Sequence, residues 1–218
     1  MNALDTVILL LLAAITYGTP LLYGTLGEIL TEKSGNLNLG VEGILFMGGA
    51  FGLGGVYYLE KFAGTPSGLV AILVALLCAF LAGAAASLIF CFLTTTLRAN
   101  QNVTGLALAI FGTGVGQFAG EMMRVRAGSY VTVSNELKDF FIASPFPQFL
   151  KDIPYLGQLI FGNSWFFYLG VVLAIGMHLF LKKTRKGLYL RAVGENPGTA
   201  DSAGINGTRY KYPATGIG

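Results

Sequence analysis

The hydrophobic pattern of the chain consists of five long apolar stretches, interrupted by short polar ones and followed by a polar stretch at the end. A helix needs roughly 20 mostly apolar residues to cross a bilayer, and each stretch is about that long. We therefore predict an all-α fold, a polytopic transmembrane helical bundle within residues 1–181, with about five spans near 6–26, 39–59, 69–97, 103–121 and 158–181.

Glycines recur at helical spacing within these stretches. Gly112, Gly116 and Gly120 repeat every four residues and share one helix face, as do Gly48 and Gly52. Small residues at this spacing let two membrane helices approach closely. The two interpretations are plain helix packing and a helix that borders a translocation path. The fourth stretch is also short and glycine-rich, which leaves open a spanning helix or a broken, re-entrant one.

The composition supports a membrane protein and suggests its orientation. Hydrophobic residues make up 54% of the chain and charged residues 11%, whereas a soluble domain carries about 25% charged residues. Seven of the 14 Lys and Arg residues fall between Lys182 and Lys211. Such a cluster beside a span marks the cytoplasmic side, so 182–218 is predicted to be a cytoplasmic loop. The N-terminus is then outside if all five segments cross, and inside if the fourth is re-entrant.

The distribution of basic residues also indicates what this loop contacts. Lys182 to Lys186 form a juxtamembrane basic run, which suits contact with anionic membrane lipid. No aromatic-interleaved basic surface occurs elsewhere in the chain, so we expect no binding of nucleic acid. Between the fourth and fifth spans, the external stretch 122–157 contains NELKDFF, which predicts a short interfacial helix. That stretch is interpreted as either a docking surface or a lid.

The chemistry that would support an enzyme is missing from the sequence. No glycine is followed at the right spacing by Gly-Lys-Ser/Thr, so the chain has no P-loop. His178 is the only histidine, which leaves no basis for most metal sites or for a histidine-based triad. We expect this chain to bind no cofactor and no metal, and to have no catalytic residues.

A second polar stretch, LGEILTEKSGNLNLGVEGILFMGGAFG at 26–52, leads into the second span. Asn36 and Asn38 can cap helix ends, and glycines permit tight reversals between them. Glu42 lies a few residues into the apolar run, where a buried carboxylate is costly unless it is paired or faces water. The alternatives are a capped interfacial turn with Glu42 at the headgroups and a broken helix at a transport path.

The last polar stretch predicts a short helix held between turns. Asn196 is a suitable cap, Pro197 suits a first helical turn, and Gly204 ends the helix about two turns later. The expected helix covers about 194–204, after a helical piece around 187–193. Such an element is shaped to insert into a groove on another protein.

These motifs resemble a permease subunit of ABC importers, in the superfamily that handles branched-chain amino acids, ribose and nucleosides. The resemblance rests on the stretch 26–52, on LRANQNVTGLALAIFGTGVGQF at 97–118 and on GLYLRAVGENPGTADSAGIN at 187–206. It implies a coupling helix that contacts a separate ATPase subunit, which binds the ATP. The residues implied in that contact are Gly194, Glu195, Asn196, Pro197, Ala200 and Gly204.

The resemblance also implies a pathway, further partners and a class of substrate. A second permease subunit, similar or different, would complete the path in the cytoplasmic membrane, and an external substrate-binding lipoprotein would deliver a nucleoside or a simple sugar. The residues implied to line or shape the path are Asn38, Glu42, Gly43, Asn100 and Gly105.

Two alternative functions are a secondary transporter or channel and a membrane-embedded enzyme. A secondary transporter or channel would place ionisable groups within its spans, and few are present. A membrane enzyme would need a set of catalytic residues that converge on one site, and none is apparent.

Family members continue with further spans where this chain ends in GTRYKYPATGIG, and PATGIG is not expected to start a helix. The sequence is therefore expected to be C-terminally truncated.

Overall fold

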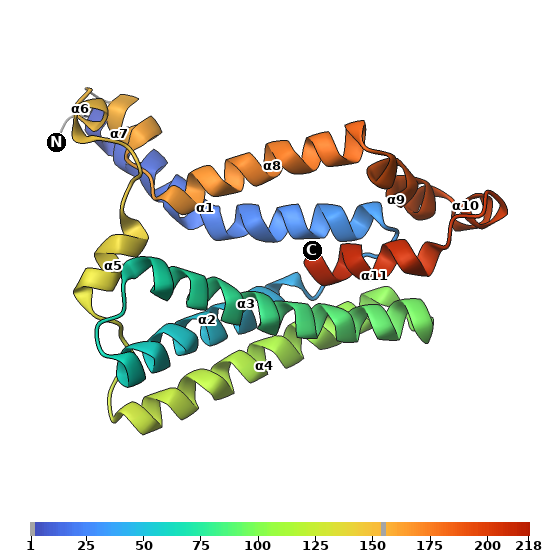
Figure 1. Cartoon of the computed structure of the whole chain (residues 1–218), viewed down its shortest axis with the longest axis horizontal. Helices are drawn as coiled ribbons and strands as arrows, with labels where there is room; N and C mark the ends of the chain where they lie inside the picture. Colours follow the sequence, from blue (N-terminus) through green and yellow to red (C-terminus); the bar gives the residue numbers. More distant parts are fainter. Residues whose placement is uncertain (1–2, 154–155) are drawn as a thin grey trace. The chain divides into compact units, whose positions relative to one another are not determined.

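A computed structural model describes residues 3–153 and 156–218. In that part of the chain the regular elements are all helical, which confirms the all-α class (Figure 1). They are α1 (Ala3–Lys33), α2 (Val41–Ala63), α3 (Gly68–Cys91), the π-helix η1 (Phe92–Thr96), α4 (Gln101–Ala127), α5 (Asn135–Ile142), α6 (Gln148–Lys151), α7 (Leu156–Phe161), α8 (Trp165–Lys183), α9 (Arg185–Glu195), α10 (Pro197–Ser202) and α11 (Gly207–Ile217).

Four of the helical stretches are long and apolar enough to cross a membrane: Asp5–Lys33, Gly68–Thr96, Gln101–Ala127 and Trp165–Lys183. Helix α2 occupies the remaining expected segment and is 23 residues long, but it is not among the four. Its sequence includes Glu42, Glu60 and Lys61, whose charges lower its hydropathy. The chain is thus a multi-pass membrane protein, and the fifth span remains a prediction.

Two expected segments differ from the structure. The fourth is one continuous helix of 27 residues and not a broken one. The reason is that its glycines keep helical dihedral angles, and a left-handed residue first occurs at Gly128, with φ of 68°. The fifth expected segment began at residue 158, but the structure separates α7 from α8 at Gly162–Ser164, because glycine, asparagine and serine favour a turn there.

The chain divides into two compact units. The first contains the described residues of 1–23 and 134–178. Within it, the Tyr23 hydroxyl donates to the Phe166 carbonyl at 2.8 Å, and the predicted short helix appears as α5. An aromatic cluster packs α5 and the segment after it against α7 and α8, through Phe141 on Phe166 and Phe146 on Phe161.

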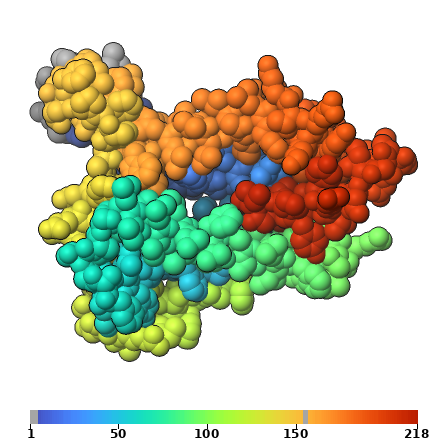
Figure 2. Space-filling model, in the orientation of Figure 1, coloured from blue at the N-terminus to red at the C-terminus, as the bar shows by residue number. Residues whose placement is uncertain are grey.

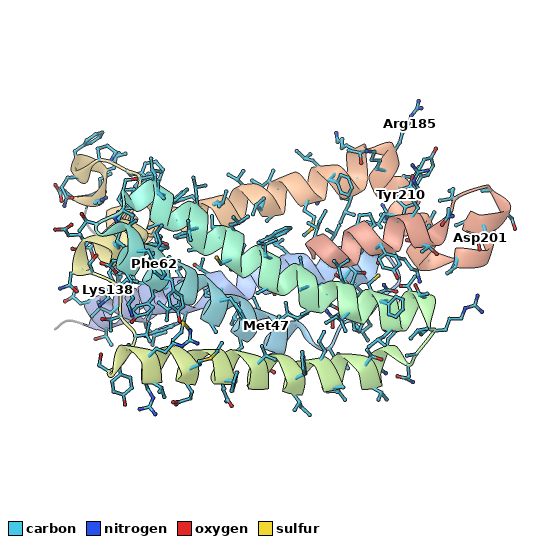
Figure 3. All side chains as sticks on the ribbon, turned by 60° about the horizontal axis from the view of Figure 1, so that its bottom comes forward. Met47, Phe62, Lys138, Arg185, Asp201 and Tyr210 are labelled. Atoms are coloured by element: carbon cyan, nitrogen blue, oxygen red, sulfur yellow. The ribbon has the colours of Figure 1, made fainter. Side chains whose placement is uncertain are left out.

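The second unit, residues 24–133 and 179–218, contains α2, α3 and α4 side by side (Figure 1). Its core cluster brings together Met47, Ala86, Phe90 and Leu108 from these three helices, and Met47 is labelled in Figure 3. Glycines allow the close approach, because a Cβ on Gly112 would lie 2.6 Å from the Gly43 carbonyl carbon. The packing interpretation of Gly112 is therefore confirmed.

The end of the chain forms a helix. Residues 207–217 are α11, and PATGIG does not begin it, as expected. The helix starts upstream of that stretch, where the Asn206 side chain accepts a hydrogen bond from the Arg209 amide at 3.2 Å. It passes through Pro213 and packs on α3, with Ala214 and Thr215 buried. Packing thus outweighs the cost of an internal proline.

Candidate functional site

The centre of the candidate site is the irregular segment between α1 and α2, residues 34–40. It is polar and yet buried, because Ser34, Asn36 and Asn38 are exposed by only 0%, 1% and 5%. Backbone amides and carbonyls that are buried need hydrogen-bond partners, because an unpaired one costs free energy. The partners of this segment therefore decide its stability.

Gln101, at the start of α4, holds the segment with both atoms of its amide. Its Oε1 accepts from the Leu37 amide at 2.8 Å, and its Nε2 donates to the Gly35 carbonyl at 3.2 Å. Glu28 adds a third contact, because its Oε1 accepts from the Asn38 amide at 2.9 Å. The linker is thus fastened to α4 and to the end of α1.

Asn36 connects the segment to η1 and α11. Its Nδ2 donates to the Thr95 hydroxyl at 3.2 Å, in η1, and to the Thr215 hydroxyl at 3.0 Å, in α11. Its Oδ1 is buried and has no hydrogen-bond partner among the described residues. The interior of the unit therefore holds a small polar cluster among apolar helices.

The predicted path residues separate into two groups. Asn38, Gly43 and Gly105 are buried where the linker and α2 meet α4. There the Asn38 side chain accepts from the Gly40 amide at 2.9 Å, and a Cβ on Gly105 would lie 2.7 Å from the Leu39 amide nitrogen. These residues shape a close contact and leave no room for larger side chains.

Glu42 and Asn100 lie differently, and both are exposed. Glu42 occupies the first turn of α2, where a carboxylate is favourable beside the helix N-terminus. Asn100 caps α4 by accepting from the Asn102 and Val103 amides at 3.0 and 3.2 Å. The structure therefore does not gather all five predicted path residues at one point.

The polar stretch at 187–206 forms α9 and α10 with a sharp break at Asn196. The Asn196 side chain accepts from the Thr199 amide at 3.0 Å, and Pro197 occupies the first turn, as predicted. Gly204 follows in the left-handed conformation, with φ of 77°. The expected bounds of 194–204 need correction: Gly194 and Glu195 belong to α9, because the helix continues to the asparagine cap.

The surface of α10 is almost entirely open. From Glu195 to Gly204 every residue except Ala200 is exposed, and Ala200 is buried against the unit at 3%. In the space-filling view this segment lies on the surface (Figure 2), and Asp201 in Figure 3 marks its position. Beside it lies a groove of about 680 Å³, whose lining includes Arg98, Pro197, Asp201 and Lys211.

Gly194 joins this exposed module to the buried linker. A Cβ built on Gly194 would lie 3.0 Å from the Gly35 amide nitrogen and would also collide with the Lys33 carbonyl oxygen. A Cβ on Gly35, whose φ is 86°, would lie 3.0 Å from the Gly194 Cα. The last turn of α9 therefore touches the α1–α2 break backbone to backbone.

Sequence reasoning missed the residues that hold the linker, namely Gln101, Glu28, Thr95 and Thr215. For Glu28 a signal exists, because it closely follows the apolar segment 6–26 and a buried carboxylate there needs a partner. Gln101 stands in the polar stretch LRANQN at 97–102 and carries no such signal. The two threonines carry no such signal, since threonine is common in membrane helices. Only the fold brings Thr215 to Asn36.

Comparison with known proteins assigns the family. The chain is 32% identical to the guanosine ABC transporter permease protein NupQ of Bacillus subtilis strain 168, over 92% of this chain and 60% of that protein. It is 29% identical to the nucleoside ABC transporter permease protein NupC of Lactococcus lactis subsp. cremoris strain MG1363, over 97% of this chain and 64% of that protein.

A third relative, TsgC13 of Haloferax volcanii, is provisionally named a glucose ABC transporter permease protein. It is 32% identical over 96% of this chain and 58% of its own length. The chain thus spans about three fifths of the length of these curated relatives. No solved structure matches it significantly. Because residues 10–218 match the family described as the permease component of branched-chain amino acid transport systems, the chain belongs to that family.

Proposed function

We propose that this chain provides membrane-spanning helices and the coupling loop of a permease subunit in an ATP-driven ABC importer. Its substrate is a nucleoside or a simple sugar, in keeping with the names of relatives that are permeases for guanosine, nucleosides and glucose. The ATP is bound and hydrolysed by a separate ATPase subunit, since this sequence has no P-loop. A second permease subunit and an external substrate-binding lipoprotein complete the importer.

The observation that carries this proposal is the contact between Gly194 and the α1–α2 break. It joins an exposed element that is suited to docking with a buried linker that is suited to shaping a path. Backbone packed on backbone transmits a displacement without the slack of a flexible side chain. A movement of α10 is therefore passed to residues 33–35 through the last turn of α9.

The mechanism follows from these connections. Closure of the ATPase dimer displaces α10, and α9 passes the displacement through Gly194 to the linker. The linker is hydrogen-bonded to α4 through Gln101, so α2 and α4 shift with it. The close crossing at Gly43 and Gly112 makes these two helices move as one body. Access to the path then changes from one side of the membrane to the other.

The test is a steric block on the exposed face of α10. Thr199→Arg adds a long side chain at an exposed position without removing the cap, because Asn196 bonds to the backbone of Thr199. Thr65→Arg makes the same change at another exposed position, in the loop between α2 and α3. Uptake of radiolabelled guanosine and co-purification of the ATPase are measured for both variants in cells.

We expect Thr199→Arg to lower uptake and ATPase recovery about tenfold or more, with Thr65→Arg close to wild type. Equal uptake and equal ATPase recovery in both variants would contradict the coupling role. Uptake that persists when the ATPase gene is deleted, and that collapses when the ion gradient is discharged, would instead favour a secondary transporter.

A further inference from the structure

A second groove, of about 380 Å³, lies between the C-terminal ends of α1 and α8 and the helices α9 and α11. We propose that it binds one anionic phospholipid, with the phosphate at the two cations of the groove and the start of an acyl chain along its apolar wall. The groove is lined by Leu30, Phe180, Lys186, Leu190, Arg209, Tyr210, Pro213, Ala214 and Ile217.

The wall of this groove is apolar. Leu190 and Ala214 are buried, at 3% and 6% exposure, and Leu30 and Phe180 are half-buried beside them. Ile217 is left 66% exposed. Apolar surface of this kind gains free energy when it is covered, and the helices α1 and α8 that border the groove are candidate membrane spans. The acyl chain of a membrane lipid is therefore close enough to cover the apolar wall of the groove.

Two cations reach the same groove from different helices, Lys186 from α9 and Arg209 from α11. Both side chains are exposed, and neither forms an ion pair within the described part of the chain. No acidic residue lines the groove. This pattern is complementary to a phosphate group, which guanidinium and ammonium groups bind by charge-assisted hydrogen bonds.

Tyr210, labelled in Figure 3, lies in the lining with both cations. Its ring packs edge-on against that of Tyr189 in α9, with centroids 6.0 Å apart. Tyrosine favours the boundary between headgroups and hydrocarbon, because its ring is apolar and its hydroxyl is polar. Tyr210 thus lies between the apolar wall and the two cations of the groove. A phospholipid has a matching arrangement, with an apolar chain next to a charged phosphate.

This site is separate from the proposed ATPase contact, because no residue of α10 lines it. It is also more specific than attraction of the whole basic loop to an anionic bilayer. Lys182 and Lys183 carry equal charges and are exposed on α8, but they do not line the groove. If the groove is a specific site, removing Lys186 and Arg209 weakens lipid binding more than removing Lys182 and Lys183. General attraction to the basic loop predicts equal losses for the two pairs.

The experiment compares two double variants of the full chain, Lys186→Gln with Arg209→Gln and, as the matched control, Lys182→Gln with Lys183→Gln. Each protein is purified in neutral detergent, titrated with phosphatidylglycerol or phosphatidylcholine, and examined by native mass spectrometry for bound lipid. The two groove cations are expected to form charge-assisted hydrogen bonds with the phosphate, and in detergent no bilayer surface is present to attract Lys182 and Lys183. We expect the groove variant to bind phosphatidylglycerol about tenfold more weakly or worse and the control to lose clearly less.

Three outcomes would overturn the proposal. Equal losses in the two double variants would mean general attraction to the basic loop. Equal retention of phosphatidylcholine and phosphatidylglycerol by the wild type would mean that the charges play no part. Displacement of the lipid by millimolar inorganic phosphate would mean a site for a free anion. Ile217→Ser tests the apolar wall separately, and it should weaken phosphatidylglycerol binding while both cations remain.

Discussion

Gly194 in α9 and Gly35 in the α1–α2 linker touch through their backbones, and a Cβ on Gly35 would lie 3.0 Å from the Gly194 Cα. Neither position has room for a side chain. The pair joins an exposed, capped module at residues 196–204 to the buried polar linker at 34–40. Four expectations follow from this contact and from the packing around it, and each is checked by one measurement.

Replacing Gly194 by alanine is expected to destabilise the protein by about 1–3 kcal/mol, as overpacking commonly does. Alanine is the better helix former by roughly 1 kcal/mol, but the new methyl group would meet the Lys33 carbonyl and the Gly35 amide. Backbone cannot rotate aside as a side chain does. The measurement is the midpoint of thermal unfolding in detergent.

Gly198→Ala is the control for that variant. Gly198 lies in α10, where the nearest atom to an added Cβ is the Asn196 Oδ1, at 3.6 Å. Its midpoint should equal or slightly exceed that of wild type. Identical midpoints for the Gly194 and Gly198 variants would show that the contact with the linker is not tight.

The crossing of α2 and α4 should respond to Gly112→Ala. The added methyl group would lie 2.6 Å from the Gly43 carbonyl carbon and oxygen, so the helices must separate, at a cost of about 1–3 kcal/mol. Gly114→Ala in the same helix meets nothing within 4 Å and should be neutral or stabilising. A Gly112 variant as stable as the Gly114 variant would rule out close packing at this crossing.

The clamp on the linker is tested by Gln101→Ala. It removes the acceptor of the Leu37 amide and the donor to the Gly35 carbonyl. Each lost hydrogen bond costs about 0.5–1.5 kcal/mol, because Leu37 is exposed and its amide can bond to water instead. Hydrogen exchange of the Leu37 amide should accelerate. Gln117→Ala, at an exposed position of the same helix, is the control. Unchanged exchange at Leu37 would argue against the clamp.

Asn196→Ala should loosen α10, because the Thr199 amide loses the side-chain oxygen that it donates to. Loss of an N-cap costs about 1 kcal/mol, so amide exchange within 198–202 should be about fivefold faster. Asn196→Asp keeps the accepting oxygen and should preserve slow exchange. If amide exchange within 198–202 is equally fast in the alanine and aspartate variants, the Asn196 cap does not stabilise α10.

Local signals predicted much of this molecule correctly. The long apolar runs indicate helices because a chain in lipid must satisfy its own backbone. The sequence Asn196-Pro197 and Gly204 marked the start and end of α10, since capping, proline geometry and left-handed glycine are properties of a few adjacent residues. The bounds of α8 and α9 were less accurate, because helix ends depend on packing as well as on composition.

By itself, then, the sequence determined a helical membrane protein and a capped polar module near its end. Only the tertiary structure decided that Gly194 meets Gly35, that Gln101 holds residues 35 and 37, and that Asn36 bonds to Thr215, 179 positions away. The physical reason is that capping and hydropathy act between neighbours in the chain, whereas these contacts depend on how close the helices approach. That approach is set by glycines whose partners lie on other helices.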